Sequence, residues 1–120
     1  MRELGIRIHR VNRHQIDEDV RANLRRLLNF HARPLALAAS LAEDLRGTFA
    51  DDLASGCPSL VSIQRKCDSE MDREHARTLL HQMIWARQLR VDLFQPIHIN
   101  HPLVPEQRDV LEVYSHLFAR

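Results

Sequence analysis

Residues 58–104 read PSLVSIQRKCDSEMDREHARTLLHQMIWARQLRVDLFQPIHINHPLV, which predicts a helix, a turn, a longer helix and a short β-hairpin. In the first helix, expected over residues 59–67, Ser59 can cap the start, and Leu60, Ile63 and Cys67 share one face. The residues that follow lack an apolar period and are expected to form the turn. This order of elements is typical of a winged helix-turn-helix.

The second helix of this stretch has the clearest pattern. Ser69, followed by Asp72 three residues later, resembles a capping box at its start. Apolar residues recur at the spacing of one helical face, at Ala76, Leu79, Leu80, Met83 and Ile84. Arg73, Arg77 and His81 recur at four-residue spacing elsewhere on the helix, and we expect them to form an exposed stripe.

The segment after the long helix changes to the period of a strand. Apolar and polar residues alternate, with Gln95-Pro96 between two runs formed by Leu89, Val91, Leu93, Ile97 and Ile99. Alternation on both sides of a turn predicts two paired strands, which would be the wing. A winged module commonly binds DNA or another protein, so this stretch narrows the function to recognition.

The winged module is expected to lie within one compact, mainly α-helical domain. Residues 1–56 would form an N-terminal extension, with a strand over 5–11, a helix from Asn12 to about His31, and a helix that Pro34 opens and Ser55-Gly56 ends. Residues 57–105 would form the winged helix-turn-helix. Residues 106–120 would form a C-terminal helix with an apolar face made of Val110, Leu111, Tyr114, Leu117 and Phe118.

Composition favours a cytoplasmic protein. The chain has 120 residues, of which 44% are hydrophobic and 28% charged, and no apolar run approaches the length of a membrane span. No secretory signal is apparent in the sequence. Cys57 and Cys67 are expected to be reduced thiols, because their spacing fits neither a metal site nor a secreted disulfide framework. The net charge of +1 excludes a strongly basic nucleic-acid binder, although a basic face can lie opposite an acidic one.

The sequence offers no catalytic constellation, cofactor motif or metal site. Among the eight histidines, His75 with His81 and His98 with His101 are the obvious pairs, but each pair is expected to point to different faces. The serines lack a nucleophile-elbow context, and three glycines cannot supply a glycine-rich phosphate loop. We therefore expect a protein that is not an enzyme.

The candidate contact residues for DNA or a partner lie on the predicted helix-turn-helix and wing: Arg65, Lys66, Arg73, Arg77, His81, Arg90 and His98. Acids at the start of the long helix, Glu70, Asp72 and Glu74, would repel phosphate there. The same mixed charge would suit a protein partner. Trp85 is expected either to pack in the core or, if exposed, to anchor such an interface.

Three segments together resemble a known family: residues 5–16 as a strand entering a helix, 23–28 on that helix, and 89–96 after the long helix. They are similar to the C-terminal part of TnsA-type endonucleases, the nuclease subunits of heteromeric transposons. The resemblance implies a helical, winged-helix domain that engages a AAA+ regulator ATPase and contributes to DNA contacts. However, the chain has a single lysine, Lys66, and no Glu-x-Lys or Asp-x-Lys pair for a nuclease metal site. If the resemblance holds, the catalytic half of that family is absent, and the chain would be a fragment, a split subunit or a relative that kept only the recognition module.

The leading functional hypothesis is a non-catalytic recognition module of a DNA transposition complex, with double-stranded DNA, the AAA+ ATPase and transposase subunits as partners and no membrane. One alternative is a free-standing winged-helix transcriptional regulator, dimeric through the C-terminal helix and the face of Leu24 and Leu28. Another is a protein adaptor or inhibitor that presents a charged face to a nucleic-acid-binding partner.

Overall fold

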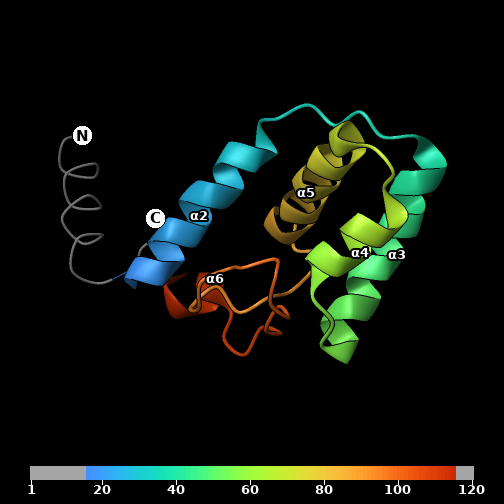
Figure 1. Cartoon of the computed structure of the whole chain (residues 1–120). Coiled ribbons are helices and arrows are strands. Elements are labelled where there is room, and N and C mark those ends of the chain that lie inside the picture. Colours follow the sequence, from blue (N-terminus) through green and yellow to red (C-terminus); the bar gives the residue numbers. More distant parts are fainter. Residues whose placement is uncertain (1–15, 116–120) are drawn as a thin grey trace.

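The computed structural model describes residues 16–115 (Figure 1). Its helices in that range are α2 (Glu18–His31), α3 (Ala39–Ser55), α4 (Ser59–Lys66), α5 (Glu70–Trp85) and α6 (Val110–Val113). The predicted strand over residues 5–11, the helix start at Asn12, and Leu117 and Phe118 lie outside the described residues. The mainly α-helical fold class is confirmed.

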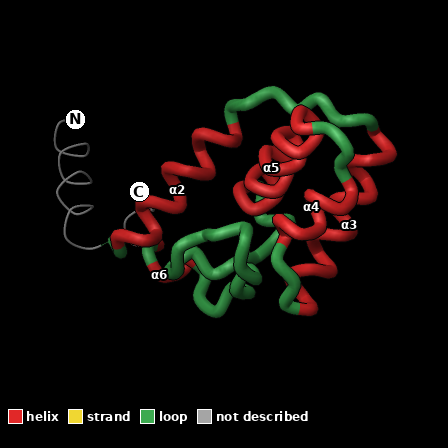
Figure 2. The backbone as a smooth tube through the Cα atoms, in the orientation of Figure 1, coloured by secondary structure: helices red, strands yellow, loops and turns green. Residues whose placement is uncertain are grey.

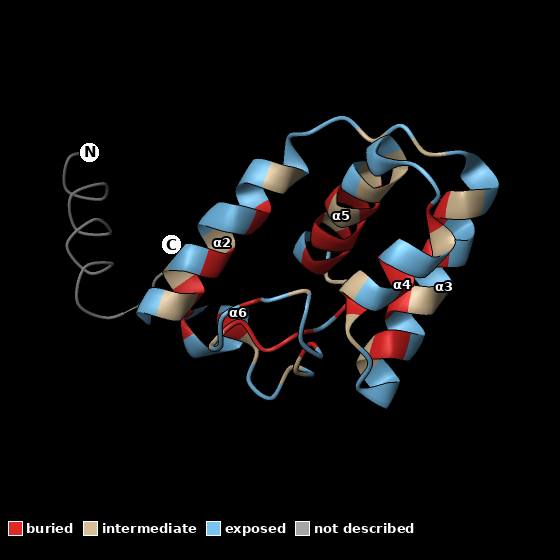
Figure 3. Ribbon diagram, viewed as in Figure 1, coloured by how far each residue is buried: buried red, intermediate tan, exposed pale blue. Residues whose placement is uncertain are grey.

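Helix α5 is the central element. It packs against α2 on one side and against α3 and α4 on the other (Figure 1). The predicted apolar face of this helix is confirmed, because every member is buried, namely Ala76, Leu79, Leu80, Met83 and Ile84. Figure 3 shows how much of α5 is buried compared with the outer faces of α2 and α3.

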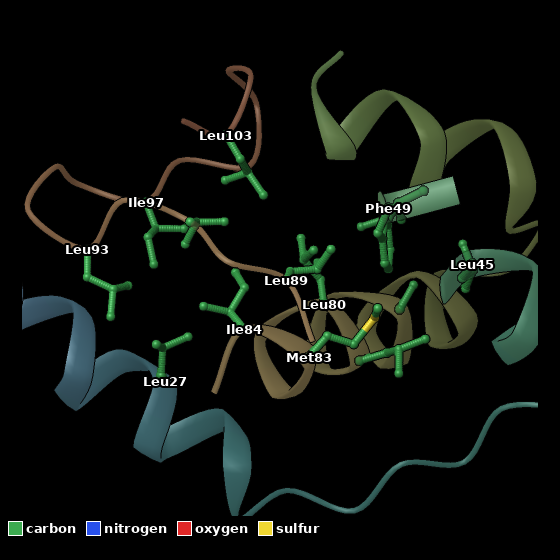
Figure 4. Close-up of a cluster of buried hydrophobic side chains, with 14 of the residues drawn as sticks. Leu27, Leu45, Phe49, Leu80, Met83, Ile84, Leu89, Leu93, Ile97 and Leu103 are labelled. Carbon is green, nitrogen blue, oxygen red and sulfur yellow. The ribbon is translucent and has the colours of Figure 1, made fainter. Parts of the chain in front are cut away.

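One core joins the helices to the segment between α5 and α6 (Figure 4). Leu45 and Phe49 of α3 contribute one end of it, and Leu27 of α2 contributes the other. Leu93 and Ile97, from the predicted wing, are buried on the side of Leu27. The alternating apolar residues of this segment therefore serve the core, whether or not they form strands.

The helix ends are set by local hydrogen bonds. The Ser69 side chain accepts a hydrogen bond from the Asp72 backbone N–H at 3.0 Å, which confirms the predicted start of α5. Asp17 caps α2 in the same way, accepting from the N–H of Asp19 at 2.8 Å. Gly56 ends α3 in the left-handed conformation, with φ of 78°, as expected for a glycine at this position.

One predicted helix start and one predicted helix cap are wrong. Pro34 does not open α3, which begins at Ala39; the residues between α2 and α3 run alongside α5 and are hydrogen-bonded to it. Gln82 of α5 donates to the Arg33 carbonyl at 3.0 Å, and His75 accepts from the Ala36 N–H at 3.3 Å. Ser59 does not cap α4: its hydroxyl is buried without a hydrogen-bond partner among the described residues.

The predicted β-hairpin wing is not formed, and residues 16–115 contain no strand (Figure 2). The segment instead makes isolated bridges, Val91 with Pro105 and Pro58 with Pro102. Residues 90–92 therefore lie opposite 104–106 and not opposite 97–99. The prolines explain part of this difference, since Pro96, Pro102 and Pro105 have no N–H to donate to a ladder.

A buried side chain of α2 explains the rest. Asn23, 4% exposed, donates from Nδ2 to the carbonyls of Leu93 at 2.9 Å and Gln95 at 2.8 Å. Its Oδ1 accepts from the Ile97 N–H at 3.4 Å. The amide thus satisfies backbone groups that a partner strand would otherwise bind, and it fixes residues 93–97 against α2.

The predicted C-terminal helix is shorter at its start than expected. It begins at Val110, where the Asp109 side chain accepts from the Leu111 N–H at 2.9 Å. Residues 105 and 106 pair instead with the segment after α5, where the Glu106 N–H donates to the Arg90 carbonyl at 2.8 Å and Pro105 bridges to Val91. Val110 and Tyr114 are buried as predicted, whereas Leu111 is exposed.

His81 is not part of an exposed stripe, and that prediction is wrong. Its side chain is 1% exposed and stacks on Phe30 of α2, with ring centroids 3.9 Å apart. Nδ1 donates to the Arg77 carbonyl at 2.7 Å, and Nε2 accepts from Arg26 Nε at 3.4 Å. These bonds fit the neutral ring. Burial lowers the pKa of His81 from 6.5 to about 4, and the neighbouring Arg26, Arg33 and Arg77 act in the same direction against the hydrogen bond to the Arg77 carbonyl.

Replacing Leu80 by alanine should lower the free energy of unfolding by about 2–5 kcal/mol, because Leu80 is fully buried between α5 and its neighbours. Urea unfolding followed by circular dichroism measures this loss. Val61→Ala is the matched control, since Val61 is half exposed on α4. A loss below 0.5 kcal/mol for Leu80→Ala would show that the face of α5 described as buried is not the face that packs in the core.

Acid should weaken the fold through His81. Below pH 6.5 the unfolded chain binds a proton at this residue and the folded chain does not, because its pKa is lowered to about 4. The free energy of unfolding should therefore fall by up to about 1.4 kcal/mol per pH unit as the pH drops from 6.5 toward 4.

Urea titrations at pH 7 and pH 5 test this expectation. His81→Gln removes the titrating group and should show a smaller loss of stability between the two pH values than the unmodified chain. Equal losses in the two proteins would contradict the assignment of the acid sensitivity to His81.

Candidate functional site

The middle of α5 is unavailable for contact with a large partner. From Ala76 to Ile84 no residue of this helix is exposed, because α2, α3 and α4 surround it (Figure 3). Its exposed residues lie in its first turns and at Trp85, while Arg77 and Gln82 between them are partly exposed. A helix that reads the DNA major groove presents its side chains along one open face, and α5 has no such face beyond its start.

The predicted arginines of α5 are engaged with acids on the same helix. Arg73 Nη1 lies 3.5 Å from Glu70 Oε1, and its Nε donates to the Cys67 carbonyl at 3.2 Å. Arg77 Nη1 lies 3.4 Å from Glu74 Oε1. Two of the three acids predicted to oppose DNA at the start of α5, Glu70 and Glu74, are thus the ion-pair partners of its arginines.

Two further predicted cations also have acidic partners. Lys66 of α4 binds Asp44 of α3, with Nζ 3.0 Å from Oδ2. Arg90 Nε donates to Glu106 at 2.6 Å, and its Nη2 lies 3.6 Å from Asp109. Arg90 therefore serves to hold residues 90 and 106 together across the bridge that replaces the predicted hairpin.

Arg65 and His98 are the predicted contact residues that remain exposed without an ion pair among residues 16–115. They lie on different elements, Arg65 on α4 and His98 on the segment after α5. The structure therefore does not bring the predicted residues together into one basic patch. Their binding to DNA or a partner stays a prediction.

An apolar groove lies between α2, the end of α5 and α6. Its volume is about 190 Å³, and it is lined by Leu24, Leu27, Ile84, Trp85, Arg87, Leu93, Val110 and Leu111. Large apolar side chains are exposed at its border: Trp85 at 36% and Leu111 at 53%. Leu28, 53% exposed, follows Leu24 by one helical turn.

Basic side chains accompany the apolar ones on the outer side of α2. Arg21 and Arg25 lie within one turn of Leu24 and Leu28 on the helix. The Nε of Arg21 is buried and has no hydrogen-bond partner within residues 16–115. The groove is thus bordered by positive charge along α2.

A second depression lies between α2 and residues 96–98. It has a volume of about 330 Å³ and is lined by Asp19, Ala22, Asn23, Arg25, Arg26, Asn29, Pro96, Ile97 and His98. His98 is the one lining residue that the sequence analysis named as a contact residue. The signal for the α2 residues was present, because Arg25, Arg26 and Asn29 lie away from the buried Val20 and Leu27 on the helix.

Reactive groups are sparse in the part of the chain that the structure describes. No group of three or more histidines, cysteines or acids among residues 16–115 could hold a metal ion. Cys57 and Cys67 are free thiols, and burial raises the pKa of the Cys67 thiol, which disfavours the nucleophilic thiolate. Within the same range, no helix has the length and apolar character needed to cross a bilayer.

An apolar groove and a basic cleft thus lie on α2 and the segment held against it. Comparison of the chain with protein-family models, with curated proteins and with solved structures finds no significant match.

Proposed function

We propose that this chain is a non-catalytic recognition module that binds a protein partner at the apolar groove. We place it in a DNA transposition complex of the TnsA-like type, where the resemblance implies a AAA+ regulator ATPase as the partner. The observation that carries the proposal is the exposure of Trp85 and Leu111 in the lining of one groove, with the exposed Leu28 one helical turn from its lining residue Leu24.

Side chains of this kind are suited to anchor an interface. Trp85 stacks on His31, with ring centroids 5.4 Å apart, so its ring is already ordered before a partner arrives. An ordered aromatic residue loses little conformational entropy on binding and excludes water over a large area. Interfaces concentrate their binding energy in such buried aromatic and aliphatic anchors.

The occupant that fits this groove is an amphipathic helix with acidic residues beside its apolar face. The apolar floor supplied by Leu24, Leu27 and Leu93 suits leucine-like side chains at helical spacing. Arg21, three residues before Leu24 on α2, complements negative charge on the partner. The regulator ATPase would supply this helix in a transposition complex.

The alternative hypothesis, a DNA-binding transcriptional regulator, has less support than the protein-binding module. It requires an exposed recognition helix and a wing, whereas the middle of α5 is covered and residues 16–115 form no strand. A protein adaptor would use the same groove, and this hypothesis differs from the transposition module only in the identity of the partner. Neighbouring reading frames distinguish the two, since a transposition role requires a gene for a AAA+ ATPase whose product binds this chain.

The groove can be tested with a synthetic helix that carries leucines at positions i, i+3, i+4 and i+7 and glutamates on the flanks, using fluorescence anisotropy. Leu28→Ser and Leu111→Ser should each weaken binding of this peptide roughly tenfold, which corresponds to about 1.4 kcal/mol. Val61→Ser on α4 is the matched control, because Val61 is 50% exposed and does not line the groove.

A version of the peptide with lysines in place of the glutamates should bind more weakly than the acidic one. Equal affinity for both peptides, or no effect of either leucine variant, would contradict the proposal. A concentration-dependent dimer in sedimentation that Leu28→Ser abolishes would assign the groove to a second copy of the chain instead.

A further inference from the structure

The cleft between α2 and residues 96–98 gathers donors of positive or neutral charge on one surface. Arg25 and Arg26 supply guanidinium groups, Asn29 an amide and His98 an imidazole. We propose that this cleft binds a phosphate group, as found in the backbone of a nucleic acid or in free phosphate. The proposal goes beyond the protein-binding role of the apolar groove and does not depend on it.

Helical spacing places the α2 residues on one face. Ala22, Arg25, Arg26 and Asn29 occupy positions i, i+3, i+4 and i+7, which lie together along a helix. Ala22 has the smallest side chain of the four and leaves room between the longer ones. The arrangement thus forms an open trough with donors at its edges.

The opposite wall is fixed before any ligand arrives. Asn23 donates to the carbonyls of Leu93 and Gln95, and accepts from the N–H of Ile97. These bonds hold Pro96 and His98 at a set place beside α2. A site whose walls are already ordered binds with a smaller entropic cost than a mobile loop would.

The guanidinium groups are available for an anion. Neither Arg25 nor Arg26 forms an ion pair among residues 16–115. The bond from Arg26 Nε to His81 orients its planar head and involves neither of its terminal nitrogens. Asp19 is the one acid in the lining, so two arginines outweigh it even with His98 neutral.

Phosphate fits this donor set better than a carboxylate does. A carboxylate has two oxygens, which one guanidinium satisfies in a bidentate pair. The cleft offers a second guanidinium, an amide and an imidazole, which suit the additional oxygens of a phosphate. Arginine is also the side chain that matches phosphate geometry with paired N–H donors.

The cleft and the groove lie on opposite sides of α2. Leu24 and Arg26 are two residues apart, which separates their side chains by about 200° around a helix of 3.6 residues per turn. A ligand in the cleft therefore leaves the groove open. The test of one surface is independent of the test of the other.

The experiment compares charge reversals on the full chain by fluorescence anisotropy with a labelled 12-base-pair duplex at 50 and 150 mM salt. Arg25→Glu should weaken binding at least fivefold and lower the salt slope by about one unit for the lost phosphate contact. Arg46→Glu is the matched control, since Arg46 is exposed on α3 and outside the cleft. Leu28→Ser should leave duplex binding unchanged.

A second arm uses inorganic phosphate and pyrophosphate, followed by NMR shifts of the Asn29 and His98 amides. Shifts at both residues, lost in Arg25→Glu, support the site with free phosphate as a source. Duplex binding that depends on Arg25 without such shifts supports the nucleic-acid backbone as the source.

Other outcomes overturn the proposal. In one such outcome, Arg65→Glu reduces duplex binding and Arg25→Glu does not. This result would assign the contact with DNA to α4. Another is binding of an acidic peptide at Asn29 and His98 in preference to both phosphate probes. Absence of both duplex binding and phosphate shifts would also overturn it.

Discussion

A single buried amide determines where the surfaces of this protein lie. Asn23 of α2 binds the backbone of residues 93–97, a segment about seventy positions away, through three hydrogen bonds. That segment forms no strand of its own, so these bonds take over the role of a ladder partner. With the segment in place, Leu93 completes the groove on one side of α2 and His98 completes the cleft on the other.

The packing of α2 on α5 is the second constraint and explains why the middle of α5 is covered. His81 stacks on Phe30, and Gln82 donates to the carbonyls of Phe30 and Arg33. Polar residues that a surface helix would present to DNA are thus used to hold two helices together. The outer face of α2 stays exposed.

Much of the fold could be predicted from the sequence, because its signals are local. Apolar periodicity identifies the buried face of α5, and Ser69 identifies its start. The same kind of local pattern could not show that the hairpin is missing. Alternation at Leu89, Val91 and Leu93 indicates which side chains are buried, but it does not indicate which segment of the backbone they lie beside. The prediction that His81 is exposed failed for a related reason. Along α5 its spacing groups it with Arg73 and Arg77, but Phe30 of α2 covers its ring, and the sequence of α5 does not reveal that contact. The clustering of Arg25, Arg26 and His98 depends on Asn23, and no local pattern reveals which distant backbone an asparagine binds.

Amide hydrogen exchange at Ile97, measured by NMR on the unmodified chain, tests the role of Asn23 most directly. The Ile97 N–H donates to the Asn23 side chain and to no backbone carbonyl among the described residues. If residues 93–97 are held on α2 as described, this amide should be protected to a degree similar to the Asp92 N–H, which donates to the Val104 carbonyl at 2.7 Å. Exchange of Ile97 at the rate of an unstructured peptide, while α2 itself stays protected, would contradict the account.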